Sequence, residues 1–415
     1  MTVTAPPRPP RPSDPVTHEE FDALVEALIE EARQRGVRRR RRNVTIVTLA
    51  ALVGVGLLAF LGRSAQSQTA SPAVSMRINA APQATSTIAY IREPLNIGYC
   101  GTVWVMKPDG SAQRRLTNGG VPGCGQERDH ALSPDGRQIA FVSHEPDPPR
   151  LGPGNPREIY VMNLDGSGQR ELTPDDDASE KSPAWSPDGR QIAFFATGLR
   201  VVNADGSGLR KLTRTGWGDS APAWSPDGRQ IAFVDRRDSS FEIYAMSADG
   251  SGQRRLTRNA WRDSDPAWSP DGRQIAFVSN WQVWVMNANG SGQRRLTHNG
   301  ARNFVPAWSP DGQRIAFERR VGRVNYGRCN ACGRAANFQV YVMNADGSGA
   351  RLLARNAAEP SWSPDGRKLA FQRRPVASSV ERDIWLINAD GSGQRNLTRT
   401  PGGVEHSPAW SPAQK

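Results

Sequence analysis

The sequence predicts an all-β fold: a seven-bladed β-propeller of four-stranded antiparallel blades, closed by the C-terminal strand and preceded by one transmembrane helix. Three observations predict it. A unit of four short pieces ("PAWSPDG", "RQIAFVS", "IYVMN" and "QRRLT") recurs roughly every 40–50 residues. The "DGSG"-type turn and the "IAF" strand each occur in seven copies. One apolar stretch near the N-terminus carries no charge.

Residues 1–42 are predicted to form a cytoplasmic tail with an amphipathic helix. Thr17 and Glu20 have the spacing of a capping box. Apolar residues then follow at helical intervals from Phe21 to Ala32, so one helix face is apolar. Such a helix fits the membrane surface or a docking and self-association role, and both interpretations remain open.

Residues 43–62 are predicted to form a transmembrane helix. At about 1.5 Å rise per residue, this uncharged stretch spans a hydrocarbon core of about 30 Å. The Arg38–Arg42 run precedes it, which keeps the N-terminus in the cytoplasm and the rest outside. A signal peptide cleaved near Ala65 and Ser67 is the alternative, but the apolar run is longer than usual for one. Residues 63–87 are small and polar, which is typical of a flexible stalk.

Residues 88–415 contain the repeats. Each piece is strand-length, rich in β-branched and aromatic residues, and bounded by Pro, Asp and Gly, which close antiparallel hairpins. The first unit lacks a "PAWSP" strand, whereas the chain ends with an extra one, Pro408–Pro412. We therefore expect the C-terminal strand to complete the first blade, which removes free sheet edges.

The motif "LT…PAWSPDGRQIAF…IYVMNADGSG" resembles the repeats of TolB-type propellers, relatives of the WD-repeat propellers. The resemblance covers residues 88–415 and implies a propeller that serves as a protein- or ligand-binding scaffold. The chain itself differs from TolB, which is a soluble periplasmic protein with a separate N-terminal α/β domain and six blades. Here a predicted membrane anchor stands in place of that domain, and seven blades are counted. A role in the Tol system therefore does not follow from the resemblance.

The formal net charge of +12 invites a nucleic-acid interpretation. The excess is arginine scattered through the repeats, with no Lys/Arg cluster outside the N-terminal region. We therefore expect no nucleic-acid partner.

Binding is expected on the face of the variable loops. Four contiguous blades carry the long loops Arg319–Phe338, Arg373–Asp383, Arg92–Thr102 and His144–Glu158. These loops are interpreted as a wall that docks a protein or peptide partner, and tolerated surface drift is the alternative.

Acidic residues stand three positions before the strand proline in several blades: Glu180, Asp219, Asp263 and Glu405. They are expected to surround one mouth of the central channel and to bind a basic peptide or a cation. The alternative is that each accepts backbone N–H bonds from a neighbouring blade. Trp217 and Trp261 lie nearby and are interpreted first as loop packing and second as partner contacts.

The four cysteines are candidates for disulfides in an oxidising exterior. Cys100 and Cys124 belong to loops of adjacent blades on the variable face. Cys329 and Cys332 form a lone C-x2-C that suits a local disulfide, because a zinc site needs further ligands. No metal and no cofactor are expected.

No catalytic motif such as G-x-S-x-G is present. His130, His298 and His406 fall in loops of the variable face but at different offsets. The sequence therefore predicts a membrane-anchored extracytoplasmic binding scaffold that is not an enzyme. The alternative is a propeller-type metal-dependent lyase or hydrolase.

Overall fold

A computed structural model of the chain describes residues 86–94, 101–117, 130–143, 157–173, 179–214, 222–236, 240–321, 338–374 and 381–411. All of them belong to the second of two compact units, residues 80–415. The predicted tail and transmembrane segment lie outside the described residues, as does nearly all of the predicted stalk. Within the described residues, no helix has the length and apolar character needed to cross a membrane.

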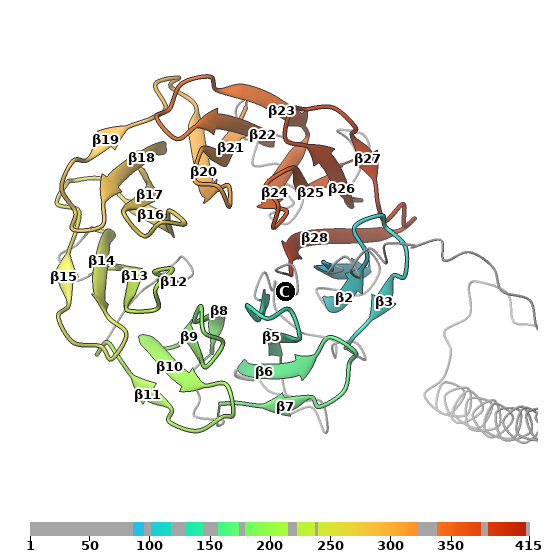
Figure 1. The fold of residues 1–415 in the computed structure, drawn as a ribbon, viewed down its shortest axis with the longest axis horizontal. Coiled ribbons are helices and arrows are strands. Elements are labelled where there is room, and N and C mark those ends of the chain that lie inside the picture. The colour runs from blue at the N-terminus through green and yellow to red at the C-terminus, as the bar shows by residue number, and fades with distance from the viewer. Residues whose placement is uncertain are drawn as a thin grey trace, which may run out of the picture. The chain divides into compact units, whose positions relative to one another are not determined.

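The described residues form seven four-stranded sheets, and Figure 1 shows these sheets as blades arranged in a ring. Every neighbouring pair of strands within a blade is antiparallel. The predicted seven-bladed propeller is therefore confirmed.

The strands of each blade run from the channel outwards. Blade 1 comprises β28 (Gly403–Trp410), β1 (Ile88–Pro94), β2 (Thr102–Met106) and β3 (Arg114–Arg115). Blade 2 comprises β4 (His130–Leu132), β5 (Gln138–Ser143), β6 (Glu158–Asn163) and β7 (Arg170–Glu171). Blade 3 comprises β8 (Lys181–Trp185), β9 (Gln191–Phe195), β10 (Leu199–Asn203) and β11 (Arg210–Lys211). Blade 4 comprises β12 (Ala223–Trp224), β13 (Gln230–Asp235), β14 (Glu242–Ser247) and β15 (Arg254–Arg255).

The remaining blades follow the same order. Blade 5 comprises β16 (Asp263–Trp268), β17 (Gln274–Ser279), β18 (Gln282–Asn287) and β19 (Arg294–Arg295). Blade 6 comprises β20 (Arg302–Trp308), β21 (Arg314–Arg320), β22 (Phe338–Asn344) and β23 (Arg351–Arg355). Blade 7 comprises β24 (Ala357–Trp362), β25 (Lys368–Arg373), β26 (Asp383–Asn388) and β27 (Arg395–Asn396).

The ring closes through blade 1, where strands from the two ends of the repeat region meet. β28 pairs antiparallel with β1, from Ile88 opposite Trp410 to Pro94 opposite Gly403. In Figure 1, β28 lies against the blade that contains β2 and β3. This pairing confirms the predicted closure and covers the inner edge of β1.

The "IAF" strands form the core because both of their faces are covered by neighbouring blades. In β17, for example, Ile275, Ala276 and Phe277 are fully buried. Phe277 belongs to a cluster with Trp268 and with residues of blade 4, whereas Ala276 packs with residues of blade 6. Complete burial of one such Ile or Phe contributes about 1.5–3 kcal/mol, so the repeated strand stabilises every blade interface.

The "PAW" pieces join consecutive blades near the channel. The indole Nε1–H of Trp224 donates to the Ala184 carbonyl of the preceding blade at 3.0 Å, and Trp268 donates likewise to Ala223 at 3.1 Å. Equivalent bonds link Trp185, Trp308, Trp362 and Trp410 to the blades before them. Blade 2 has Leu132 at this position, so its joint with blade 1 lacks an indole donor.

A bulge precedes the proline of most inner strands. The register shifts between Ser264 and Ala267 in β16, and Asp265 takes a positive φ of 54°. Ser182, Val305, Glu359 and Ser407 have the same backbone at the same repeat position. Proline follows each of them, and its missing N–H costs no ladder bond at a bulge.

The outermost strands are shorter than the sequence predicts, because most of the "QRRLT" pieces pair over two residues only. The threonine that follows replaces the missing ladder bonds. Thr257 Oγ1, for example, accepts the Ile243 N–H at 2.9 Å, and Thr297 Oγ1 accepts the Val283 N–H at 3.0 Å. The threonine side chain thus adds to the backbone bonds between strand three and strand four, such as that from the Leu256 N–H to the Ile243 carbonyl.

Candidate functional site

The acidic residues expected at the channel mouth are buried. Glu180, Asp263 and Glu405 are 0% exposed, and Asp219 lies outside the described residues together with Trp217. Glu180 Oε2 accepts the Ile159 N–H at 3.0 Å and the Thr173 hydroxyl at 2.5 Å, both from blade 2. This is the alternative that the sequence left open, a carboxylate that joins neighbouring blades. These carboxylates were expected to surround one mouth of the central channel. Glu180, Asp263 and Glu405 are instead buried against protein groups, so this expectation is corrected. Their role in binding stays a prediction.

Burial changes the protonation of these carboxylates. Desolvation raises the pKa of Glu180 to about 8, and the nearby Glu158 carboxylate adds to this shift against the Thr173 hydrogen bond. Desolvation likewise raises the pKa of Glu405 to about 7, although Arg92 pairs with it at 2.7 Å. The pKa of Asp263 rises to about 6 for the same reason. Glu180 therefore holds its proton near neutral pH, whereas Glu405 exchanges its proton in that range.

Trp261 does reach solvent. Its side chain is 46% exposed, and its backbone N–H donates to Asn259 Oδ1 at 2.8 Å. Trp261 is thus available for contact, which is the second interpretation that the sequence allowed. The predicted disulfide residues Cys100, Cys124, Cys329 and Cys332 lie outside the described residues, as does most of the predicted loop wall.

The candidate site is a cluster of polar side chains on β1 and on the inner strands of blades 1, 2 and 7. His406 on β28 is its centre. Its Nε2 lies 3.1 Å from Glu93 Oε1, and its Nδ1 lies 3.0 Å from Ser407 Oγ. We call this chain of contacts, Ser407–His406–Glu93, the channel relay. Its tautomer decides which nitrogen donates.

Strand register explains why Glu93 and His406 meet. Ile91 of β1 is opposite His406 of β28, and Glu93 lies two residues further along β1. Side chains two residues apart project from the same sheet face. Ile91 packs in the core cluster shared with blade 2, so that face looks towards His130 on β4. Glu93 therefore contacts His406 diagonally across the strand pair.

Ser407 is positioned by the bulge and by blade 7. Its φ is 53°, and its N–H donates to Glu359 Oε2 at 2.7 Å. The hydroxyl lies 3.2 Å from the same carboxylate oxygen. Glu359 in turn donates its own N–H to Glu318 Oε1 of blade 6 at 2.6 Å. The hydroxyl therefore has two acceptors within reach, the His406 ring and the Glu359 carboxylate.

The electrostatics of the cluster favour an ionised Glu93. Burial raises the pKa of Glu93, but the hydrogen bond and the charge of His406 together outweigh burial, so the pKa ends below its usual value. His130 behaves differently: burial first and the His406 charge second lower its pKa to about 4. His130 is therefore neutral at physiological pH.

A hydroxyl hydrogen-bonded to an imidazole, itself held by a carboxylate, is the arrangement used for nucleophilic catalysis. The imidazole accepts the hydroxyl proton and the carboxylate stabilises the imidazolium that results. The bulged backbone of Ser407 is a fold feature, since Ser182 shares it without a histidine beside it. Within the described residues, no group of three His, Cys, Asp or Glu side chains has metal-binding geometry.

Sequence reasoning found only part of this cluster. It singled out His130 and His406 but expected them in loops, whereas they lie on β4 and β28, and it missed Glu93, Ser407 and Glu359. Ser407 stands beside His406 in the string "EHSP", which was the available signal. Glu93 is separated from His406 by 313 residues and becomes its neighbour only through ring closure. His298 lies exposed between blades 5 and 6, away from the blades of the cluster.

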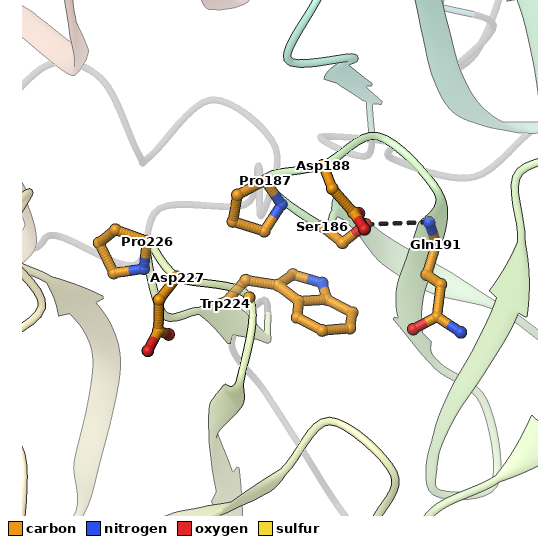
Figure 2. A pocket seen from close by; sticks show the side chains of 8 residues that line it. Ser186, Pro187, Asp188, Gln191, Trp224, Pro226 and Asp227 are labelled. Atoms are coloured by element: carbon orange, nitrogen blue, oxygen red, sulfur yellow. Dashed lines mark hydrogen bonds between the residues drawn. The ribbon is translucent and has the colours of Figure 1, made fainter.

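A hollow of about 300 Å³ lies on the opposite face, between the "SPDG" turns of blades 3 and 4. Figure 2 shows Trp224 between the two turns, with Pro187 and Pro226 near it and the Gln191 N–H bonded to Ser186 Oγ. Gly228 closes one turn with a φ of 70°, a backbone that favours glycine. The same turn sequence recurs in other blades, so the hollow belongs to the architecture.

Comparison with known proteins identifies the repeats. The family model described as the TolB beta propeller domain matches residues 200–414, just over half of the chain. A solved puromycin-hydrolyzing peptidase from Mycobacterium tuberculosis shares the fold with a TM-score of 0.55 at 14% identity, over 77% of this chain and 53% of that one.

Two curated relatives are named as peptidases. Dipeptidyl-peptidase 5 of Porphyromonas gingivalis is 41% identical over 66 residues, 16% of this chain and 9% of the relative. The uncharacterized peptidase YuxL of Bacillus subtilis is 32% identical over 118 residues, 27% of this chain and 16% of the relative. The chain thus spans a small part of both. These relatives contradict the prediction that the chain is not an enzyme, because the repeats that it shares with them occur in proteins named as peptidases.

Proposed function

The chain belongs to the TolB beta propeller domain family, and from this premise we propose that it is a hydrolase of peptide-like substrates that uses the channel relay. The observation that carries the proposal is the contact of Ser407 Oγ with His406 Nδ1 at 3.0 Å, with Glu93 bonded to the other ring nitrogen. The peptidase names of the curated relatives support the substrate class.

In the proposed reaction, His406 Nδ1 takes the Ser407 hydroxyl proton while Oγ attacks the scissile carbonyl carbon. Glu93 accepts a hydrogen bond from Nε2 and stabilises the imidazolium. The imidazolium then protonates the leaving amine, which leaves an acyl group on Ser407. Water, deprotonated by the same imidazole, hydrolyses this ester and restores the hydroxyl. Glu359 holds the Ser407 backbone N–H throughout.

The test measures covalent labelling and turnover with matched variants. The purified protein is treated with a fluorescent fluorophosphonate and, separately, with a library of quenched fluorogenic peptides. Ser407→Ala and His406→Gln are expected to abolish both signals. Ser182→Ala is the control, because Ser182 has the same bulged backbone, with a φ of 58°, in blade 3. Labelling that persists in Ser407→Ala would exclude the proposed nucleophile.

Location is a separate part of the proposal. We infer that residues 43–62 anchor the chain in the membrane with the propeller outside the cytoplasm, on the basis of the uncharged stretch and the Arg38–Arg42 run. A tag at Met1 and protease added to intact cells test this. The propeller is expected to be digested and the tag protected. Digestion of the tag in intact cells would contradict the orientation.

A second function, capture of a protein partner on the variable loop face, is favoured by a different observation. Exposed aromatic and arginine side chains gather on that face in blades 4–6. This surface lies on other blades than the channel relay, and both functions can belong to one propeller.

A further inference from the structure

Blades 1 and 7 carry the same arginine–tryptophan stack. The Arg92 guanidinium carbon lies 4.1 Å from the Trp104 ring centroid in blade 1, and that of Arg373 lies 4.6 Å from the Trp385 ring centroid in blade 7. The side of blade 1 that bears its stack packs against blade 7, and the side of blade 7 that bears its stack packs against blade 6. One repeat feature therefore occurs at two consecutive blade joints.

In blade 1, both donors of the stack have acceptors. Arg92 Nε donates to Glu405 Oε1 at 2.7 Å, and the Trp104 indole Nε1–H donates to Thr102 Oγ1 at 2.8 Å. Side chains of the protein itself thus satisfy both groups, as is usual for buried polar atoms.

In blade 7, the corresponding donors have no acceptor. Arg373 Nε and Trp385 Nε1 are buried and have no hydrogen-bond partner among the described residues. The guanidinium does reach a neutral acceptor with another nitrogen, since Nη1 donates to Gln394 Oε1 at 2.7 Å. Burial lowers the pKa of Arg373, and within the described part of the chain no acid offsets this effect. Two adjacent donors, one of them charged, therefore lie unsatisfied at one joint, which costs free energy.

A single residue position explains the difference between the two blades. β24 places Ala357 opposite Arg373, whereas β28 places Glu405 opposite the arginine of blade 1. The same register puts Asn303 opposite Arg319 in blade 6, where Arg319 Nε donates to Asn303 Oδ1 at 3.3 Å. Blade 7 thus has a methyl group at the position from which blades 1 and 6 supply an acceptor.

The chain around this joint does not replace the missing acceptor. Glu318, on the side of β21 that faces blade 7, accepts the Glu359 N–H with Oε1 at 2.6 Å. Residues 322–337 join β21 to β22 and residues 375–380 lie between β25 and β26, and neither segment contains an aspartate or a glutamate. The first of them contains three arginines. A carboxylate at this joint would therefore come from a ligand.

We propose that the joint of blades 6 and 7 binds a carboxylate ligand at Arg373 and Trp385. Glu405 shows the chemistry in blade 1, where a carboxylate oxygen pairs with Nε of the stacked arginine. A carboxylate has two acceptor oxygens, so one can accept from the guanidinium and the other from the indole, and the bond to the guanidinium is charge-assisted. Both side chains are half-buried, so the stack lies at the edge of the joint although its two donor atoms are covered. A small organic acid and the C-terminus of a peptide both present this group.

The experiment measures thermal unfolding of the full chain at pH 7 while sodium acetate replaces sodium chloride at constant ionic strength. Acetate is expected to raise Tm along a saturating curve, by about 2 °C, because a ligand that binds only the folded chain stabilises it. Ala357→Glu supplies the carboxylate from the chain itself, so it should raise Tm without acetate and remove the acetate response. Arg373→Gln should also remove the response.

Arg319→Gln is the matched control. Arg319 occupies the same repeat position in blade 6 and stacks on the Tyr341 ring at 3.8 Å, but its Nε already has an acceptor. The acetate response should persist in this variant. N-acetyl-trialanine distinguishes the two sources of the carboxylate: a half-maximal concentration at least tenfold below that of acetate assigns the site to a peptide C-terminus, and any higher value assigns it to a small acid.

Three results would overturn the proposal. One is a Tm that acetate leaves unchanged. The second is an acetate response that survives in Arg373→Gln or Ala357→Glu, which would indicate a general salt effect. The third is a larger response to phosphate than to acetate, which would indicate another class of anion. If Ala357→Glu does not fold, Ala357→Asp makes the same test with a shorter side chain. Fluorophosphonate labelling of Ser407 does not enter any of these outcomes, so this proposal and the hydrolase proposal fail separately.

Discussion

The Nε2 atom of His406 lies 3.1 Å from Oε1 of Glu93, although 313 residues separate them in the chain. Ring closure creates this contact, because His406 belongs to the last strand and Glu93 to the first. The same pairing that completes blade 1 thus places a carboxylate behind an imidazole whose other nitrogen meets a serine hydroxyl. Closure and the candidate site share one structural origin.

Glu93→Gln is predicted to lower kcat for peptide hydrolysis by about 100-fold and to change KM little. Glutamine keeps the size and one hydrogen-bonding oxygen, but it has no negative charge to stabilise the imidazolium. Steady-state kinetics measure both constants, and thermal unfolding checks that the fold is kept. An unchanged kcat would show that Glu93 has only a structural role.

The stability of the propeller is predicted to fall as the pH rises from about 5 to about 8.5. Glu180 and Glu405 have folded-state pKa values of about 8 and about 7, above the ordinary value of 4.5. Below pH 4.5 both acids are protonated in the folded and the unfolded chain, so their contribution is fully present. As the pH rises, the unfolded chain releases these protons first, which favours unfolding until the folded-state pKa values are passed.

Denaturant unfolding at a series of pH values measures this dependence. Glu180→Gln cannot release a proton, so its unfolding free energy should depend less steeply on pH in that window. Glu171→Gln, which changes an exposed carboxylate on β7, should keep the original slope. Equal slopes in all three proteins would contradict the assignment of the raised pKa to Glu180.

Deletion of residues 403–415 is predicted to destabilise the whole ring. Blade 1 would lose its inner strand, and both β1 and the neighbouring blade 7 would lose a packed face. The deletion would also remove the hydrogen bond that the Trp410 indole N–H donates to the Ser361 carbonyl at 3.2 Å. Thermal unfolding should occur at a markedly lower temperature and with aggregation, because an open sheet edge pairs with other chains. An unchanged unfolding temperature would refute closure as a source of stability.

The fold was predictable because the same four-strand unit recurs many times along the chain. Strand-length pieces such as the one at Ile275 and turns such as the one at Gly228 follow local rules, and counting them gave the number of blades. Closure was predictable from the surplus strand at Pro408. These inferences need only the order of pieces along the chain.

The candidate site was much less predictable, because it depends on register and on burial. Glu180 and Asp263 look like surface acids in the sequence, and only the packed joint shows that they face threonine and backbone groups. The arginines seemed scattered for the opposite reason: folding brings Arg262 and Arg302 to consecutive joints of one face. Glu93 carries no sequence signal at all, since its role depends on the strand that pairs with it.

Covalent labelling of Ser407 tests the central claim most directly. The full chain is treated with a fluorescent fluorophosphonate, digested, and the labelled peptide is identified by mass spectrometry. The hydrolase proposal predicts a single adduct on Ser407 that disappears in His406→Gln and persists in Ser182→Ala. No adduct on Ser407, or equal labelling of Ser182 and Ser407, would contradict it.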